Sequence, residues 1–409
     1  MKGRQPLVAS LDIGTTKVCT VVGEAHKEGL TILGVGTHPN KGLRKGMVIN
    51  LEAVVNAVQR SVEEAELMAG CEISGVYAGI SGSHIKSFNS HGMIPLKGRE
   101  VTAKDIERVR EVAGAVAIPR DREILHILPF EYIVDSQRDI RDPVGMTCVR
   151  LDVNCHIITG ATASTDNIHK CCERLRFQVN ETVFDPIAGG MAVLTEDEME
   201  QGVILLDIGG GTSDLAVFSE GALIHTSVLP LAGNHITKDL AHGLNIPPAP
   251  MAENLKVKYG SALAGDVDPE EQVRIDDMGG EISRSFSRQI ICDIIEQRCD
   301  EILRLLREEV DSAELLPLAR SGVVLTGGCA KLPDIDKLAG RIFNTRVRIG
   351  TPRKISGHID QVDDPSFSTA VGLALYGHNN VMRGVAGAHL DRGIMRLIRK
   401  AQDWIKELF

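Results

Sequence analysis

Aromatic residues are scarce in this chain, and acidic residues outnumber basic ones. Only 3% of its 409 residues are Phe, Trp or Tyr, and its formal net charge is −10. A protein that binds nucleic acid through the phosphate backbone needs a basic surface, so general nucleic-acid binding is not expected. The length exceeds what one hydrophobic core serves, and we expect two or more domains.

Paired cysteine motifs are missing as well. The nine cysteines are scattered, their number is odd, and none forms a C-x-x-C pair. A zinc site or a disulfide framework is therefore not expected, and reduced thiols in a cytosolic protein are the better interpretation.

Long apolar runs are also absent. No stretch approaches the ~18 apolar residues of a membrane-spanning helix, and the N-terminal sequence MKGRQPLVASLDIG is too weakly apolar for a signal peptide. The sequence predicts a chain that neither crosses a membrane nor is exported, although it can still lie on a membrane surface.

Two stretches far apart in the chain are near-copies of each other. Residues 8–18 read VASLDIGTTKV, and residues 204–217 read ILLDIGGGTSDLAV. Each is an apolar run, an aspartate, a glycine-rich turn and a second apolar run, which predicts two strands joined by a tight turn. Each turn offers a carboxylate and several backbone N–H groups, as a phosphate chain with its Mg²⁺ ion requires. Two such turns facing each other predict a site for one nucleotide.

The side chains of the two turns suggest individual roles. Asp12 and Asp207 are predicted to hold Mg²⁺ through water, because Mg²⁺ keeps most of its hydration shell. Glycine lets the backbone approach the phosphates closely, and Lys17 adds a positive charge. The residues predicted to bind phosphate are Gly14, Thr15, Thr16, Lys17, Gly209, Gly210, Gly211 and Thr212.

A third glycine turn is predicted to receive the nucleoside. The apolar run VVLTGG ends in Gly327 and Gly328, where a base and ribose can lie against the backbone. Glu253 and Lys256 lie three residues apart on one predicted helical face, so they either reach the ribose and base or form a solvated surface. The Walker A pattern is absent, which excludes a P-loop site.

These motifs resemble those of the actin, Hsp70 and sugar-kinase superfamily. The two phosphate motifs, VVLTGG, PIAGGMAVL and STAVGLALYG carry the resemblance. Nearly the whole chain is similar to one member family, the bacterial cell-division proteins called FtsA, with support from SGVVLTGGCAKL and RIFNTRVRIG. The resemblance implies ATP binding and an actin-like α/β fold. This is a duplicated ribonuclease-H-like fold, with two lobes around a nucleotide cleft and a family-specific inserted subdomain.

The predicted division of the chain follows from these motifs and from changes in pattern between them. The first lobe is expected to comprise residues 1–81 and 162–200, the insertion 82–161, the second lobe 201–228 and 301–377, a smaller subdomain of that lobe 229–300, a flexible linker 378–393, and an amphipathic helix 394–409.

Catalysis is a separate question from binding. In related ATPases a Glu or Gln at the start of the linking helix orients the attacking water, and here the stretch FDPIAGG offers Asp185. Asp214 is a second carboxylate nearby in sequence. Asp185 precedes a proline, so it can equally serve as a helix cap. We expect at most a slow ATPase whose main role is structural.

The C-terminal stretch IMRLIRKAQDWIKELF predicts an amphipathic helix. Its apolar face comprises Ile394, Leu397, Ile398, Ala401, Trp404, Ile405 and Leu408, with Phe409 at the border, and its polar face comprises Arg396, Arg399, Lys400, Asp403, Lys406 and Glu407. Most such helices dock on a protein core. This one is locally basic in an acidic chain and follows a predicted linker, which favours an anionic membrane surface.

The resemblance implies a membrane-tethered, ATP-dependent polymerising adaptor. Such a protein forms filaments with itself and links filaments of the tubulin-like division protein FtsZ to the inner membrane at the septum. The FtsZ tail would dock on residues 229–300, where Arg284, Arg288 and Arg298 are candidate partners for an acidic peptide or simply a solvated helix face. The inserted subdomain would contact other division proteins. A small-molecule kinase and a membrane-associated pilus-assembly ATPase of the same superfold remain as alternatives.

Overall fold

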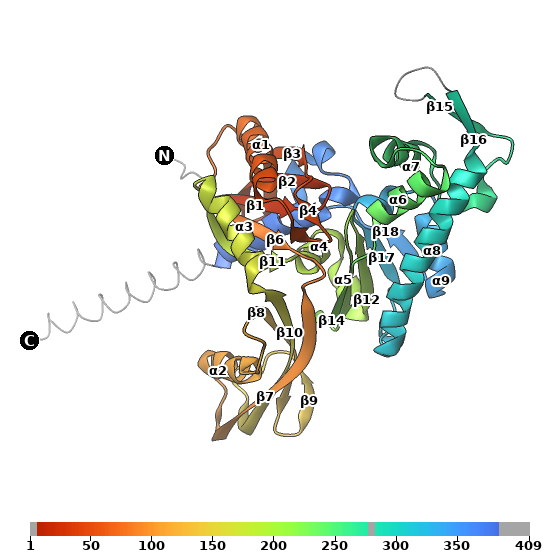
Figure 1. Ribbon diagram of the computed structural model, residues 1–409. Coiled ribbons are helices and arrows are strands. Elements are labelled where there is room, and N and C mark those ends of the chain that lie inside the picture. Colours follow the sequence, from red (N-terminus) through yellow and green to blue (C-terminus); the bar gives the residue numbers. More distant parts are fainter. Residues whose placement is uncertain (1–5, 277–282, 384–409) are drawn as a thin grey trace, which may run out of the picture.

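The computed structural model describes residues 6–276 and 283–383, and within them no helix is long and apolar enough to span a membrane. Figure 1 shows two lobes side by side, with a smaller body below the first lobe. The mixed α/β architecture with an inserted subdomain confirms the predicted fold class.

The first lobe is built on a six-stranded sheet in the order β11-β6-β1-β2-β3-β19. Its strands are β1 (Leu7–Ile13), β2 (Lys17–His26), β3 (Gly29–Pro39), β6 (Gly75–Ile80), β11 (Gln178–Phe184) and β19 (Ile355–Gly357). The first three form an antiparallel meander, and β6 and β11 continue the sheet in parallel from β1. A short hairpin of β4 (Leu43–Arg44) and β5 (Met47–Val48) follows β3.

The second lobe repeats this topology. Its sheet has the order β14-β13-β12-β17-β18. The strands are β12 (Val203–Ile208), β13 (Ser213–Ser219), β14 (Ala222–Leu229), β17 (Val323–Thr326) and β18 (Val347–Ile349). Again three antiparallel strands are followed by two parallel ones. The near-copied sequences therefore occupy equivalent strands of two equivalent sheets.

Helix α1 (Leu51–Ala69) illustrates how the sequence defines these elements. Asn50 caps its N-terminus, where the side-chain oxygen accepts a hydrogen bond from the Ala53 N–H at 3.1 Å. Gly70 ends the helix in the left-handed conformation that favours glycine. The buried face of α1 consists of Val54, Ala57, Val58, Ser61, Val62 and Ala65. This stripe packs on β2 and β3, and α3 (Thr162–Arg174) lies beside it.

The second lobe carries its own subdomain and the longest helix of the described part. Its helices are α6 (Gly233–Gly243), α7 (Glu253–Tyr259), α8 (Arg288–Ser312) and α9 (Ile335–Phe343), and a hairpin is formed by β15 (Gln272–Asp276) and β16 (Ser283–Ser287). The buried face of α8, with Ile291, Ile295, Ile302 and Leu306, joins the core of this lobe.

The inserted subdomain has a separate sheet and a separate core. Its elements are β7 (Lys86–Glu100), α2 (Ala103–Gly114), β8 (Arg122–Val134), β9 (Gln137–Ile140) and β10 (Thr147–Ala161), and its sheet order is β7-β10-β8-β9. Helix α2 covers this sheet, and the core includes Ile94, Leu96, Val109, Leu151 and Val153. An independent core of this kind is consistent with an insertion that folds as a unit.

Two helices link the lobes and cross each other closely. They are α4 (Asp185–Val193), which is followed by α5 (Glu196–Gln201), and the helix over residues 368–383. A Cβ atom at Gly372 would lie only 1.9 Å from the carbonyl oxygen of Ala188. Glycine at this position therefore sets the distance between the two linking helices.

Two predicted boundaries differ from the structure. Residues 355–357 were expected in the second lobe, but β19 pairs in parallel with β3 of the first sheet. The linker was expected from residue 378, but residues 378–383 continue the preceding helix. Val381 packs against the cluster of Val8 and Tyr77, which explains why the helix extends past the glycine at 377. The predicted amphipathic helix lies outside the described residues.

Replacing Gly372 with alanine should destabilise the protein. Forcing a Cβ into the Ala188 backbone typically costs about 1–3 kcal/mol, which outweighs the ~1 kcal/mol that alanine gains over glycine in helix propensity. Urea denaturation should show a lower midpoint for Gly372→Ala. The control is Gly265→Ala, because a Cβ there meets nothing within 4 Å. Equal midpoints for the two variants would contradict the close crossing.

Candidate functional site

Two adjoining cavities of about 160 and 350 Å³ lie between the lobes. They share Thr16, Gly209, Gly210, Gly328 and Ser366 in their linings. The smaller is also lined by Asp12, Gly14, Thr15, Lys17, Asp185, Asp207, Gly211, Thr212, Asp214 and Gly327, and the larger by Glu253 and Lys256. The structure thus brings together all the residues for which nucleotide, Mg²⁺ or catalytic roles were predicted.

The two phosphate turns, residues 14–17 and 209–212, have the same local structure. The Gly14 N–H donates to the Lys17 carbonyl at 3.0 Å, and the Gly209 N–H donates to the Thr212 carbonyl at the same distance. Each turn closes a hairpin, and the aspartate lies near the end of the first strand of that hairpin. Sequence similarity between the copies therefore extends to the hydrogen bond that shapes each turn.

The two turns also lie against each other. A Cβ atom at Gly210 would lie 2.3 Å from Thr16 Cγ2, and one at Gly211 would lie 2.3 Å from Thr15 Oγ1. Any larger residue at either glycine would push the two turns apart. Glycine is thus required here by close approach between the lobes.

Four aspartates gather at the floor of the cleft. Asp207 and Asp214 are buried, and Asp12 and Asp185 are partly exposed. Desolvation raises the pKa of Asp12 to about 7, that of Asp207 to about 6 and that of Asp214 to about 8. These values include the charge of Asp207, which contributes to raising the pKa of Asp12, and the charges of Asp207 and Asp12, which contribute to raising that of Asp214. The site therefore favours a cation.

Asp185 begins helix α4 and points into the same cleft. Desolvation, followed by the charges of the other three aspartates, raises its pKa well above the ordinary value. Its Oδ1 atom is buried and has no hydrogen-bond partner among the described residues. An orphaned carboxylate oxygen at a helix N-terminus is suited to hold a water molecule or a cation.

Hydrogen bonds fix the side chains around the aspartates. Thr369 donates to Asp207 Oδ2 at 3.1 Å, and Ser81 donates to Asp214 Oδ1 at 2.6 Å. Lys17 lies 3.7 Å from the centre of the Phe367 ring and donates to the Ser366 hydroxyl at 3.0 Å. These contacts hold the Lys17 ammonium group at the wall of the smaller cavity.

The second cavity is lined by a polar network on α6 and α7. The Lys256 ammonium donates to the Glu253 carboxylate at 2.8 Å and to the Thr237 hydroxyl at 3.0 Å, and Thr237 also bonds to Glu253. Lys256 is therefore part of a packed wall and is not a freely solvated side chain. Hydroxyl and amine groups of a nucleoside are suitable partners for such a wall.

Some residues in or beside the two cavities were missed by the sequence interpretation. Asn40 supports the first turn by donating from its side chain to the Gly14 carbonyl at 2.8 Å. Thr369, Ser366, Cys329 and Lys331 line the cavities. Thr369 lies in the quoted motif STAVGLALYG, and Cys329 and Lys331 lie in SGVVLTGGCAKL, but no role was predicted for them. Ser366 lies in none of the quoted motifs.

The residues present fit a nucleotide with Mg²⁺. A Cβ at Gly327 would lie 2.2 Å from Asp207 Oδ1, whereas one at Gly328 meets nothing within 4 Å, so Gly328 faces open space. Within residues 6–276 and 283–383, no group of three or more His, Cys, Asp or Glu side chains is placed to hold a metal. Mg²⁺ on nucleotides is usually bound through one or two carboxylates together with phosphates and water. Asp12 and Asp207 are carboxylates of this kind.

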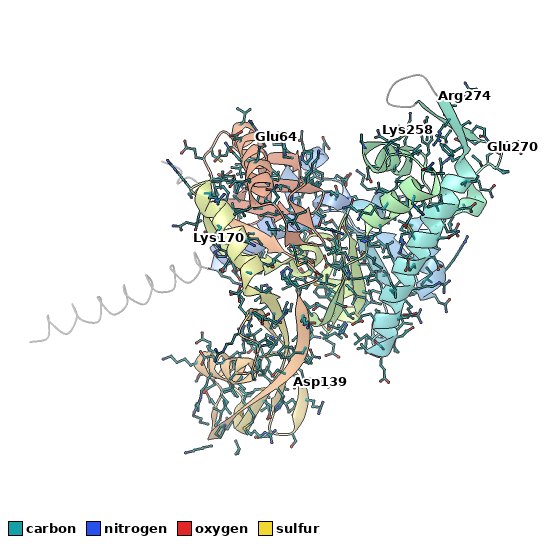
Figure 2. All side chains as sticks on the ribbon, in the orientation of Figure 1. Glu64, Asp139, Lys170, Lys258, Glu270 and Arg274 are labelled. Carbon is teal, nitrogen blue, oxygen red and sulfur yellow. The ribbon has the colours of Figure 1, made fainter. Side chains whose placement is uncertain are left out.

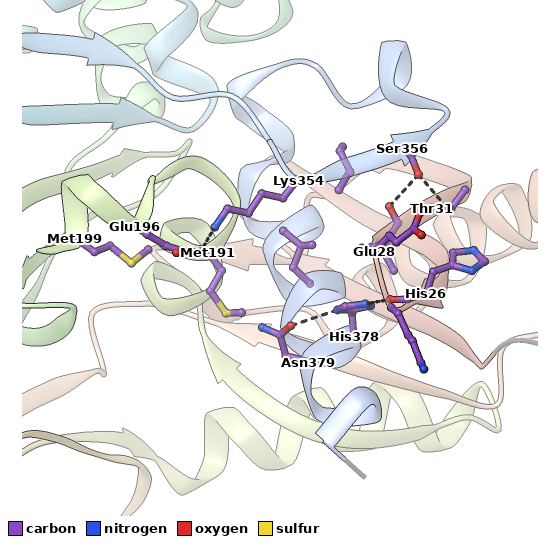
Figure 3. A pocket seen from close by; sticks show the side chains of 15 residues that line it. His26, Glu28, Thr31, Met191, Glu196, Met199, Lys354, Ser356, His378 and Asn379 are labelled. Carbon is purple, nitrogen blue, oxygen red and sulfur yellow. Dashed lines mark hydrogen bonds and ion pairs between the residues drawn. The ribbon is translucent and has the colours of Figure 1, made fainter. Parts of the chain in front are cut away.

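A larger cavity, of about 880 Å³, lies at the opposite ends of the linking helices (Figure 3). Lys354 pairs with Glu196 at 3.2 Å across it, and His378 Nε2 donates to the His26 carbonyl at 2.8 Å. None of the glycine turns lines this cavity. The phosphate turns and the aspartates meet instead in the smaller cleft, which is therefore the candidate site for the predicted nucleotide.

The three arginines predicted to bind a partner already have contacts within the chain. Arg298 pairs with Asp239 and Glu301, and Arg288 pairs with Glu271 at 2.8 Å. Arg284 donates to the Asn245 carbonyl at 2.9 Å and is otherwise exposed. An incoming acidic peptide would have to compete with these carboxylates for Arg288 and Arg298.

The duplicated sheets, the crossing linking helices and the facing turns define an actin-like fold. Two solved structures share it. The PilM–PilN type IV pilus biogenesis complex aligns with a TM-score of 0.66 at 18% identity, covering 91% of this chain and 98% of that one. MreB5 of Spiroplasma citri bound to ADP aligns with a TM-score of 0.55 at 14% identity, covering 95% and 99%.

Sequence comparison identifies the family. A family model described as cell division protein FtsA matches residues 204–372, and another described as an SHS2 domain inserted in FtsA matches residues 82–159. The cell division protein FtsA of Pseudomonas aeruginosa is 43% identical over 91% of this chain and 89% of its own length. That of Escherichia coli K12 is 42% identical over 98% of both chains. The chain belongs to the FtsA family of cell-division proteins.

Stability should depend on pH through Asp214. Its pKa rises from 3.8 to about 8 on folding, so the native state binds more protons than the unfolded chain between these values. The contribution of Asp214 to stability is therefore present at low pH and is lost as pH rises through about 8.

To isolate this effect, the wild type is compared with Asp214→Asn, whose side chain cannot ionise but can still accept a hydrogen bond from Ser81. Without nucleotide, we expect the stability of the variant relative to the wild type to increase steadily from pH 5 to pH 8.5. Urea denaturation at each pH measures the difference. A difference that stays constant would show that Asp214 does not titrate in this range.

Proposed function

We propose that this protein is an ATP-binding, actin-like polymerising adaptor that links FtsZ filaments to the cytoplasmic face of the bacterial inner membrane during septum assembly. The observation that carries the proposal is the contact between two aspartate–glycine turns on opposite lobes, in a chain of the FtsA family. A nucleotide held between these turns would join the lobes, because each turn belongs to one of them.

The residues of the cleft suggest how Mg–ATP is held. Asp12 and Asp207 would bind the hydrated Mg²⁺, and the backbone N–H groups of both turns would face the phosphates. Gly327 and Gly328 would lie under the nucleoside, and Glu253 and Lys256 would face its ribose and base. Bound Mg²⁺ would supply positive charge that keeps the aspartates ionised.

Asp185 is the residue we propose for orienting a hydrolytic water. Burial and the neighbouring carboxylates raise its pKa, which lowers the ionised fraction that can act as a base at a given pH. Its side chain is also one carbon shorter than that of glutamate. Both features favour slow turnover and a nucleotide that acts mainly as a conformational and polymerisation switch.

Changing Asp185 to alanine tests this role. We expect single-turnover ATP hydrolysis to fall about a hundredfold, the lower range for a lost general base, while ATP affinity changes little. Fluorescent ATP-analogue titration and single-turnover measurement on the same sample separate the two effects. Unchanged hydrolysis would contradict this role; capping is not the alternative, because Phe184 is at the N-cap of α4 and no side chain caps the helix.

The C-terminal stretch 394–409, which lies outside the described residues, supports the proposed membrane location by its sequence. Each basic residue near an anionic leaflet contributes about 1 kcal/mol, and buried apolar side chains add a similar amount each. One such helix would bind reversibly. Several of them on a filament would bind far more firmly, because the first contact raises the effective concentration of the rest.

Trp404 makes this prediction easy to test, because it is the one tryptophan in the chain. Adding anionic vesicles should shift its fluorescence to shorter wavelength, and neutral vesicles should shift it less.

A truncated chain gives a second test. In ATP-dependent co-sedimentation with anionic vesicles and FtsZ, a chain ending at Gly393 should lose vesicle recruitment and keep FtsZ binding. Intact vesicle recruitment by the truncated chain would contradict the tether.

The FtsZ tail is proposed to dock on residues 229–300. Of the three candidate arginines, Arg284 is the most available, because its described contact is with a backbone carbonyl.

The alternative functions, a small-molecule kinase and a pilus-assembly ATPase, predict different outcomes. A small-molecule kinase would transfer phosphate to an added sugar, and a pilus-assembly role has support only from the shared fold of the PilM–PilN complex.

A further inference from the structure

The inserted subdomain touches both lobes of the cleft. It leaves the first lobe directly after Ser81 and returns to it at residue 162. Its strand β8 also contributes His126, whose Nε2 accepts a hydrogen bond from the Phe184 N–H at 3.0 Å. Phe184 immediately precedes Asp185 on the linking helix. One side of the insertion is thus fixed to the first lobe beside the cleft floor.

The other side of the insertion is bonded to the second lobe through Thr226 on β14. The Ser87 hydroxyl donates to the Thr226 carbonyl at 2.8 Å, and His156 Nε2 lies 2.9 Å from the Thr226 hydroxyl. His156 Nδ1 lies 2.7 Å from Asn89 Oδ1, so this nitrogen donates and Nε2 accepts from Thr226. We call Ser87, His156 and Thr226 the Thr226 latch.

Thr226 and His156 of the latch are buried in the interface between the inserted subdomain and the second lobe. Thr226 is 4% exposed and His156 is 1% exposed. Separating a hydrogen-bonded pair that is buried this completely costs free energy, because both polar atoms lose their partner unless water enters the gap. A second contact of the insertion, between Arg141 and Glu200 of α5, is exposed to solvent.

Paired strands join the latch to the second phosphate turn. The second phosphate turn leads directly into β13, and β13 pairs with β14. In this ladder Asp214 lies opposite Val228, and Ala216 lies opposite Thr226. Ser81, the last residue before the insertion, bonds to Asp214 on the same strand. A movement of the second turn relative to the first lobe therefore carries the latch with it.

We propose that the Thr226 latch makes the orientation of the inserted subdomain depend on the nucleotide in the cleft. The phosphate turns touch each other in this structure and the latch is formed, so the latch belongs to the closed cleft. When the cleft opens, β14 moves away from β7 and β10, and the insertion is released from the second lobe. This inference rests on the proposed nucleotide binding and names a regulation of that site.

Linkage gives the proposal a quantitative consequence. If bound nucleotide favours formation of the latch by some factor, then the formed latch favours nucleotide binding by the same factor. One net hydrogen bond corresponds to about threefold to tenfold in an equilibrium constant. A partner that held the insertion against β14 would raise ATP affinity in the same way.

The test compares Thr226→Val with a matched control. Valine keeps the shape of threonine and removes the hydroxyl. The control is Thr165→Val, because the Thr165 hydroxyl is buried and has no partner among the described residues. Ser87→Ala removes the other latch bond and serves if Thr226→Val folds poorly. Hydrogen exchange of β7 and β10 and ATP affinity are measured on the same samples of full-length protein.

In the wild type and in Thr165→Val, Mg–ATP should slow amide exchange in β7 and β10. In Thr226→Val and Ser87→Ala this slowing should be lost, and ATP should bind about threefold to tenfold more weakly. If ATP binds the wild type but leaves exchange in the insertion unchanged, or if the latch variants behave like the control, the inference is wrong. If ATP does not bind the wild type, the proposed function fails and the inference falls with it.

Discussion

Four aspartates at the floor of one cleft are the constraint on which the rest of this structure depends. Asp12, Asp185, Asp207 and Asp214 come from both lobes and from a linking helix, and desolvation raises the pKa of each. Like charges at short range in a desolvated site cannot all remain ionised without a compensating cation. A fold that keeps such a cluster is therefore suited to a ligand that brings positive charge and joins the lobes, as Mg–ATP does.

The same constraint explains why glycine stands where the two lobes and the linking helices approach most closely. The aspartates can lie near one another only if the turns that follow them approach closely, and Gly210 and Gly211 permit that contact with Thr16 and Thr15. Gly372 permits the equivalent approach of the linking helices. These positions thus control how far the lobes can close. The inserted subdomain, on which Figure 2 labels Asp139, is hydrogen-bonded to both lobes, which is why we propose that its orientation follows that closure.

Much of this arrangement could be predicted from the sequence. The duplicated motif gave two equivalent hairpins, because an apolar run, an aspartate and a glycine turn have few alternative structures. The structure brings together the residues predicted around the nucleotide, and the comparisons confirm the family. Asn40, Ser366 and the Thr226 latch could not be predicted, because each acts through a contact between segments far apart in the chain. The linker boundary was misplaced because Val381 packs on the first lobe, a tertiary contact that the polar local sequence does not indicate.

The most direct test of the central claim is calorimetric titration of ATP into the full-length protein, with and without Mg²⁺. Asp12→Asn is compared with Asp139→Asn, an exposed aspartate on the insertion. The account predicts that Mg²⁺ strengthens ATP binding to the wild type and to Asp139→Asn, and that Asp12→Asn loses most of this strengthening. Binding that is independent of Mg²⁺, or equal in the two variants, would contradict it.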